Sequence, residues 1–297
     1  MKKDLFLLVT LTCSVIGGFS YSDELLPLNI VLAGVRHYDS KVKSIKAEIV
    51  DDRIIDSSIR IRAEYTLAFM GPRQYLDEKI WEGKVSSKLK LRNPTRIIVY
   101  DGERCWAKVI FNSGRVEYTV TTKRNFNGRL DPRSWLAFTW YDYDRYGLAD
   151  YLIRRKAKMK GKEKLNGEVC YVLEFKEEKR KGKFWIAPYK GFRLLKSEII
   201  GFNEDGGERF KSVREFIYKR FPDDIWFPVE IRVKLVDFSS GRLRIVHKGV
   251  MKLKEIEVNT DVSSLFHLDI PLDTKVFDFD SGRSYLAKDI IPREWKD

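Results

Sequence analysis

The amino-acid sequence predicts a mainly β protein, an α+β chain organised on one large antiparallel sheet that is curved or closed. Segments in which apolar and polar residues alternate recur at near-regular spacing, and short turn signals separate them. Aromatic residues make up 13% of the 297 residues, which favours strands because flat rings pack well on a pleated surface. No linker divides the pattern, so we expect a single mature domain.

The first 22 residues have the layout of a secretory signal peptide. A short basic start precedes an apolar run from Leu5 to Gly18, and small residues around Ser20 supply a cleavage site. The apolar run is short for a membrane span. Cys13 raises lipidation as an alternative, although Thr12 stands where a lipidation signal carries a smaller residue. The sequence therefore predicts an exported protein whose mature part begins near residue 23.

Two parts of the chain show helical patterns. Apolar residues at positions 28, 31, 32 and 35 predict an amphipathic helix over Leu25 to Tyr38. Asp131-Pro132 provides a helix start, because aspartate caps the first turn and proline suits its first position. A second helical piece is expected from Asp144 to Arg155. Aromatic residues are frequent in this insertion, which is therefore expected to cover an apolar surface.

Strands dominate the segment before residue 123. From Ser58 to Phe69 an apolar side chain stands at every odd position from 59 onwards, which is typical of a long strand with one dry face. Asp101-Gly102 is a strong hairpin signal. The other strands expected here are 44–50, 79–91, 96–100, 104–111 and 115–122.

Strands resume after the helical insertion. Asn166-Gly167 is the strongest hairpin dipeptide in the chain. Lys183 to Ile200 forms a second hairpin, with Pro188 and Gly191 in its turn. The remaining expected strands are 158–162, 169–175, 210–220, 229–237 and 242–258. Extended segments continue to Tyr285, and residues 286–297 are predicted to be a loose polar tail.

No motif in the sequence points to catalysis, a cofactor or a metal. Nucleophile elbows, phosphate loops and dinucleotide fingerprints are absent from the sequence. The histidines are His37, His247 and His267, in unrelated settings, and no His/Cys/carboxylate spacing suggests a metal site. A solvated helix face explains the acidic residues around Asp144, and the segment 278–281 only partly resembles a calcium loop. We therefore expect a non-enzymatic protein without cofactor or metal.

The charge and the cysteines leave alternatives open. The net charge is +13, and only residues 154–164 and 176–183 are densely basic. Such runs are usually solvated faces of strands or helix ends, but contact with an anionic membrane surface is an alternative. Nucleic acid is not expected as a partner. Cys105 and Cys170 remain after signal removal and would either pair or lie as free buried thiols.

The order of these elements resembles the LolA/LolB-like superfamily of outer-membrane lipoprotein-sorting proteins. The resemblance covers most of residues 25–285. The hairpin from Phe184 to Phe192 is similar to a Trp-Ile-Asp-Pro-type turn common in that family. Trp226-Phe227-Pro228 before a strand and the tail from Phe266 to Asp278 also fit.

The resemblance implies an incomplete β-barrel, with helices covering its concave face, over residues 23–285. It implies a carrier or binding protein for lipid acyl chains or lipoproteins in the periplasm, working with envelope transport proteins. An envelope interaction module with a packed core and a basic surface for anionic partners is the alternative. The side chains expected to line a hydrophobic cavity are Ile61, Tyr65, Leu67, Leu89, Trp135, Phe138, Phe184 and Ile186.

Overall fold

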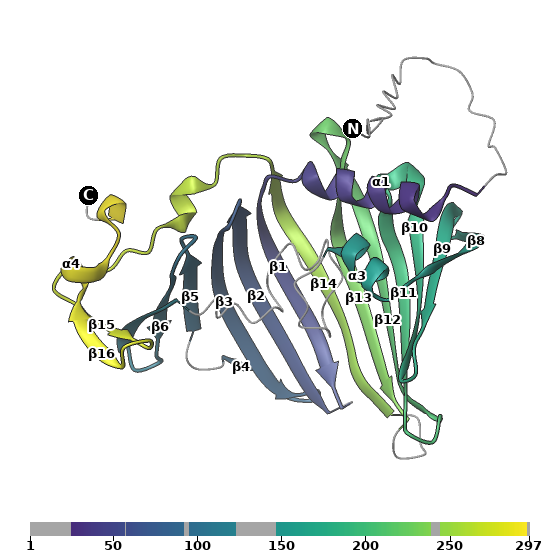
Figure 1. Cartoon of the computed structure of the whole chain (residues 1–297). Helices are drawn as coiled ribbons and strands as arrows, with labels where there is room; N and C mark the ends of the chain where they lie inside the picture. Colours follow the sequence, from purple (N-terminus) through teal and green to yellow (C-terminus); the bar gives the residue numbers. More distant parts are fainter. Residues whose placement is uncertain (1–24, 57, 92–94, 123–146, 239–243, 296–297) are drawn as a thin grey trace, which may run out of the picture.

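The protein forms one strongly curved, open sheet of 16 strands (Figure 1). The computed structural model describes residues 25–56, 58–91, 95–122, 147–238 and 244–295. The strand order is β16-β15-β7-β6-β5-β3-β2-β1-β14-β13-β12-β11-β10-β9-β8, with β4 paired to β3 outside this path. The predicted fold class, a single curved antiparallel sheet with helices, is therefore confirmed.

The strands before the helical insertion form one half of the sheet. They are β1 (Ser44–Ile55), β2 (Ile59–Met70), β3 (Arg73–Lys84), β4 (Lys90–Leu91), β5 (Thr95–Tyr100), β6 (Cys105–Ile110) and β7 (Val116–Thr121). One expectation was wrong: the strand predicted over 79–91 ends at Lys84. The amide of Ser87 donates to the carbonyl of Lys84 over 2.9 Å and begins a turn, so pairing resumes only at Lys90.

The strands after the insertion form the other half. They are β8 (Lys158–Leu165), β9 (Glu168–Lys176), β10 (Arg180–Ala187), β11 (Arg193–Phe202), β12 (Glu208–Phe221), β13 (Ile225–Asp237) and β14 (Arg244–Val258). The predicted turn between β8 and β9 has φ of 52° at Asn166 and 84° at Gly167, as a type I′ hairpin turn requires. Strand β14 pairs with β1 over ten residue pairs and joins the two halves.

Among the described residues, the helices α1 (Leu28–Ser40) and α3 (Leu148–Arg154) lie on the concave face of the sheet (Figure 1). In α1 the buried side chains are Val31, Leu32 and Val35, the stripe that the sequence predicts. The second predicted piece of the insertion is confirmed in shortened form as α3. The first piece, which starts at Asp131, lies outside the described residues. Within the described part of the chain, none of the helices combines the length and apolar character needed to cross a bilayer.

The C-terminal segment covers the opposite, convex face of β2 and β5–β7. It comprises η3 (Ser263–Phe266), β15 (Lys275–Asp278), β16 (Arg283–Leu286), α4 (Ala287–Ile290) and η4 (Arg293–Trp295), and β15 pairs with β7 in parallel. The segment 286–295 is packed where a loose polar tail was expected. Ala287 and Ile291 are buried, and the ring centroid of Trp295 lies 5.3 Å from that of Trp106.

Cys105 and Cys170 form no disulfide with each other. Cys105 in β6 and Cys170 in β9 are both free and buried. Nine strands separate β6 from β9 in the strand order, which places the two thiols in different parts of the sheet. Of the two alternatives left open by the sequence, the structure has free buried thiols.

Candidate functional site

The principal hydrophobic core lies between the concave face and the two helices. Successive side chains of a strand point to opposite faces, so each strand contributes alternate residues. In β2, Tyr65, Leu67 and Phe69 belong to this core, whereas Ala68 belongs to the core under the C-terminal segment. Strands from both halves of the sheet contribute in the same way. The concave face is thus an apolar surface shared by strands far apart in the sequence.

Under α3 this surface is closed by aromatic packing. The Tyr151 ring lies 6.1 Å from that of Phe175 and 6.0 Å from that of Phe184, and the last two rings stack at 5.9 Å. Phe184, Ile186 and Leu152 have no solvent exposure. This half of the concave face is therefore a well-packed wall.

The C-terminal end of α1 is fixed to the sheet by Arg193. Its Nη2 donates to the carbonyl of Tyr38 over 3.1 Å and its Nε to the carbonyl of Trp226 over 2.9 Å. Its Nη1 pairs with the carboxylate of Asp39. Burial raises the pKa of Asp39 to about 6, although the Arg193 charge opposes that rise. One buried guanidinium thus joins α1, β11 and β13.

Helix α1 packs against the turn between β10 and β11. A Cβ on Gly34 would overlap the ring of Phe192, and a Cβ on Gly191 would overlap the ring of Tyr38. Gly191 also has a φ of 67°, which glycine adopts without strain. The hairpin turn that the sequence marks with Pro188 and Gly191 therefore supports a helix.

Beside the side chains that are fully buried, the concave face has a part that is only half-buried among the described residues. Apolar side chains there come from strands of both halves of the sheet, and each keeps part of its surface accessible to solvent. They are Ile61, Ile80, Ile98, Ile199 and Val233. This region offers an apolar surface that the described helices leave partly uncovered.

Charged groups interrupt the apolar face near its centre. Arg53 Nη2 lies 2.8 Å from Asp51 Oδ2 and donates to the Tyr65 hydroxyl over 3.2 Å. The Asp51 side chain is 5% exposed, and burial raises its pKa to about 6, with Arg53 acting in the opposite direction. Burial also raises the pKa of the Tyr65 phenol. A buried acid–base pair on a face otherwise built for apolar contact is an unusual feature that needs an explanation.

The eight residues predicted to line a cavity have different locations. Ile61, Tyr65 and Leu67 lie along β2 on the concave side, and Phe184 and Ile186 lie in the packed wall on β10. Leu89 lies in the connection between β3 and β4, next to Gly83, and is half-buried. Trp135 and Phe138 lie outside the described residues.

Sequence reasoning missed the charged residues of the concave side. Asp51, Arg53, Arg193 and Arg214 all lie in strands and are largely buried. The sequence offers one signal for them, since each stands at or near an inward position of its strand where an apolar residue would be expected.

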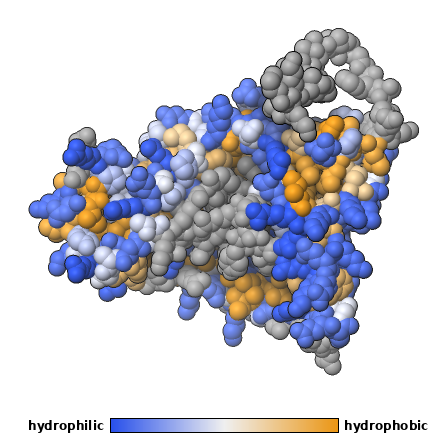
Figure 2. All heavy atoms as spheres, in the orientation of Figure 1, coloured by the Kyte–Doolittle hydropathy of each residue, from blue (hydrophilic) through white to orange (hydrophobic). Residues whose placement is uncertain are grey.

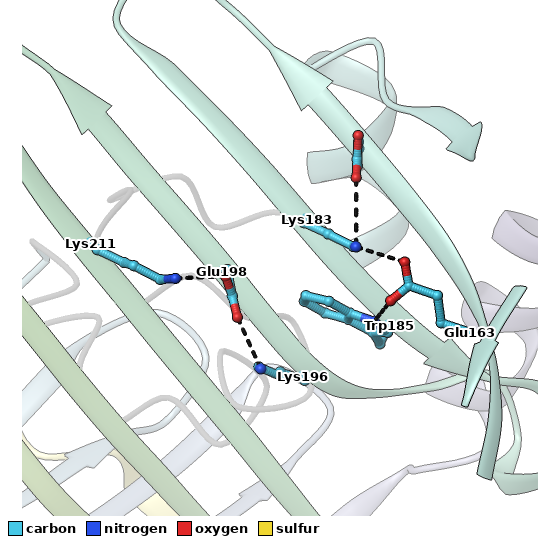
Figure 3. Close-up of polar contacts among 7 residues, drawn as sticks. Glu163, Lys183, Trp185, Lys196, Glu198 and Lys211 are labelled. Carbon is cyan, nitrogen blue, oxygen red and sulfur yellow. Dashed lines mark hydrogen bonds and ion pairs between the residues drawn. The ribbon is translucent and has the colours of Figure 1, made fainter. Parts of the chain in front are cut away.

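The convex side of β8–β12 carries a network of paired charges (Figure 3). Lys183 lies 2.7 Å from Glu163, which also accepts a 2.7 Å hydrogen bond from the indole of Trp185. Glu198 pairs with Lys196 and Lys211 at 2.9 and 3.0 Å. The basic run 176–183 is thus partly neutralised, as expected for the solvated face of a strand. Figure 2 shows hydrophilic residues over much of this face of the molecule, with apolar ones gathered around α1, at the C-terminal segment and at the lower edge of the sheet.

The described residues contain no cluster of three or more histidine, cysteine or acidic side chains able to hold a metal ion. The segment 278–281, which only partly resembles a calcium loop, makes structural contacts. The Asp280 carboxylate accepts hydrogen bonds from the Thr121 hydroxyl, over 3.0 Å, and from the Thr122 amide. Asp278 in turn accepts bonds from the Asp280 amide and the Ser281 hydroxyl. These bonds tie the C-terminal segment to β7.

Comparisons with known proteins give similarity at the level of structure. No protein-family model and no curated protein matches the sequence. The chain is similar to a LolA superfamily protein from Nitrosomonas europaea, with 15% identity and a TM-score of 0.41 over 82% of this chain and 99% of the other. It is also similar to a porin-like protein from Bacteroides uniformis, with 7% identity and a TM-score of 0.21 over 73% of this chain and 96% of the other.

Proposed function

We propose that this protein is an exported, non-enzymatic carrier or binding protein for the acyl chains of lipids or lipoproteins. The observation that carries the proposal is the half-buried apolar part of the concave face, to which Ile61, Ile80 and Val233 contribute. Apolar side chains that stay partly accessible on one face of a globular protein are one mark of a binding site. A hydrocarbon chain laid on this surface would gain about 0.8 kcal/mol for each buried methylene.

The two parts of the concave face have different roles in this proposal. Ile61, Tyr65 and Leu67 on β2 lie beside the open part and would contact the chain. Phe184 and Ile186 belong to the packed wall under α3, so they would contact a ligand only after α3 moves. Leu89 would act at the rim, because it lies in a connection next to β3.

In this proposal the protein acts in the bacterial cell envelope. The signal-like residues 1–22 support export to the periplasm, and residues 23–285 would form one mature domain. Envelope transport proteins would deliver or receive the lipid. A transient contact with an anionic membrane surface is compatible with the net charge of +13.

Binding can be tested directly on the mature chain purified without detergent. Native mass spectrometry should detect co-purifying acyl species, and a fluorescent fatty acid should bind. Ile61→Glu places a charge on the open part of the concave face and should weaken binding at least tenfold, because burying it against an acyl chain is costly. Ile217→Glu makes the same change on an exposed convex position of β12 and should leave binding unchanged.

Acyl-chain binding would be refuted if no acyl species co-purified with the protein and the fluorescent fatty acid did not bind. Salt-sensitive binding to anionic vesicles under the same conditions would then favour the interaction module with a packed core.

A further inference from the structure

The edge of the sheet at β8 carries a high density of positive charge. Residues 154–164, which run from the end of α3 through most of β8, contain seven lysine or arginine residues and one acidic residue, Glu163. Strand β8 is the last strand in the strand order, so one of its two sides has no neighbouring strand in the described sheet. The positive charges therefore lie along an open edge.

Four of these basic side chains have no ion pair or hydrogen bond within the described part of the chain. All four are exposed lysines: Lys156, Lys158, Lys160 and Lys164. The neighbouring acidic side chains pair with other cations. Glu163 lies 2.7 Å from Lys183, and Glu177 lies 2.9 Å from Arg155. Glu174 stands opposite the first strand lysine in the register, and its carboxylate lies 3.9 Å from Lys183.

Several lysines elsewhere in this half of the sheet are paired, by contrast. Lys190 lies 3.0 Å from Glu168, and Lys181 lies 3.5 Å from Glu208. The convex side of β10–β12 has the further ion pairs of Figure 3. Protection against pairing with another chain is a reason for lysines on an edge strand, but it does not require that they lack acidic partners. The unpaired lysines of β8 therefore favour a negatively charged partner outside the chain.

The lysines of β8 reach both faces of the edge. Lys158 is opposite Glu174, whose neighbour Leu173 belongs to the concave core, so Lys158 lies on the convex side. The register shifts after Met159, and Lys164 is opposite Val169, on the concave side. A negatively charged surface that meets the sheet edge-on would thus contact lysines from both faces.

Exposed apolar side chains flank the same edge. Ile153 near the end of α3 is 46% exposed, and Leu25 just before α1 is 48% exposed. The backbone of Leu26 forms a hydrogen bond with the Tyr171 phenol, and the ammonium of Lys162 lies 5.7 Å from the centre of the same ring. The start of α1 therefore lies beside β8 and β9, where Figure 2 shows apolar residues bordered by hydrophilic ones.

We propose that the β8 edge is the surface by which this protein docks on an anionic phospholipid bilayer. The inference rests on the proposed function for its setting in the cell envelope, and it names the part of the chain that meets the membrane. Lysines are attracted to an anionic bilayer, and aliphatic side chains beside them can enter its head-group region. A protein partner fits this edge less well, because lysine is depleted from protein–protein interfaces.

The test measures binding of the full mature chain to vesicles by flotation. Vesicles of phosphatidylcholine alone are compared with vesicles of equimolar phosphatidylcholine and phosphatidylglycerol. The wild type should bind the mixed vesicles at least about tenfold more tightly, and added salt should weaken that binding. The double variants Lys156→Gln/Lys160→Gln and Lys158→Gln/Lys164→Gln should each weaken it by about tenfold, because each removes two charges from the edge. Circular dichroism should show that both variants keep the fold.

Lys234→Gln/Lys248→Gln is the matched control. These two exposed lysines stand opposite each other on β13 and β14, away from the edge, and their replacement lowers the net charge by the same amount. The control should bind mixed vesicles as the wild type does. Equal binding of the two kinds of vesicle by the wild type, or equal binding by the control and both edge variants, would overturn the inference.

Fatty-acid binding by the same proteins separates this inference from the proposed function. The edge variants should bind the fluorescent fatty acid as the wild type does. If the wild type binds the fatty acid but does not distinguish the two kinds of vesicle, docking at this edge is refuted and acyl-chain binding stands. If none of the proteins binds the fatty acid while the edge variants alone lose vesicle binding, acyl-chain binding is refuted and the docking surface stands.

Discussion

Asp51 illustrates how a single buried carboxyl links stability to pH. The side chain is almost fully buried on β1, with the Arg53 guanidinium 2.8 Å away. Burial raises its pKa from 3.8 to about 6. Between pH 4 and 6 the folded protein therefore keeps a proton at Asp51 that the unfolded chain has released. The free energy of unfolding consequently falls as the pH rises through this interval.

The first prediction concerns Asp51→Asn. The variant lacks the titrating carboxyl, so its stability relative to the wild type should rise between pH 4 and pH 7. The rise should be about 1.4 kcal/mol for each unit by which the pKa is shifted. Any difference between the two side chains that does not depend on pH displaces the two stability curves by a constant, so the prediction concerns the change with pH. Urea unfolding at several pH values measures it.

Asp52→Asn serves as the control for this experiment. Asp52 is the next residue of β1, is 37% exposed and pairs with Arg60 on the other face. A stability difference between the two variants that stays constant from pH 4 to pH 7 would contradict a raised pKa at Asp51.

At the scale of elements, the attachment of α1 depends on few contacts. The helix has 13 residues, and its C-terminal end is held by the buried Arg193. By contrast, the pair between Arg36 of α1 and Asp150 of α3 is exposed, with side-chain exposures of 56% and 47%. Exposed pairs contribute about 0–1 kcal/mol, whereas breaking a buried pair costs about 3–5 kcal/mol. The Arg193 contacts should therefore decide whether α1 stays docked.

The second prediction follows from this difference. Arg193→Gln removes the pairing with Asp39 and should increase hydrogen exchange throughout α1, while strands β9 and β10 keep their protection. Arg36→Gln, the control, should leave α1 exchange nearly unchanged. Equal protection of α1 in the two variants, measured by mass spectrometry of peptides covering residues 28–40, would show that Arg193 does not anchor the helix.

Sequence patterns predicted the elements better than the contacts between them. The Asp101-Gly102 and Asn166-Gly167 hairpins and the strand at 58–69 follow from local rules, because turn chemistry and alternation act between near neighbours. The Arg193–Asp39 pair joins residues 154 positions apart, and no local pattern specifies such a partner. The inward position of Arg53 has only a weak local signal: position 53 continues the alternation of Ile45 and Ile49, but an isolated arginine in a strand usually faces solvent.

For the predicted cavity residues, too, local sequence patterns predicted which face of a strand a residue lies on but not what covers it. Alternation along β2 placed Ile61, Tyr65 and Leu67 on one face, and they share that face in the structure. Whether such a residue is covered depends on helices distant in sequence: α3 packs over Phe184 and leaves Ile61 half-buried. The packing of residues 286–295 was missed because it depends on Trp106, far upstream in the sequence.

At the scale of the whole molecule, the two largest hydrophobic cores among the described residues lie on opposite faces of one sheet. The core under α1 and α3 occupies the concave face, and the core under the C-terminal segment lies behind β2 and β5–β7. Strand β2 contributes to both, through Leu67 on one side and Ala68 on the other. Because continuous hydrogen-bonded pairing links β7 to β9, loss of either core should destabilise the other.

The last prediction is that the mature chain unfolds as a single cooperative domain. Hydrogen exchange measured in increasing urea should show strands β5–β7 and β9–β11 losing protection at the same denaturant concentration, because β2, β1 and β14 couple the two halves. Chains of this length can also unfold through intermediates. Release of β5–β7 at clearly lower urea would therefore divide the chain into two units and contradict a single domain over residues 23–285. Coincident release would mean that an acyl ligand on the concave face also stabilises the distant C-terminal segment, by mass action on one folding equilibrium.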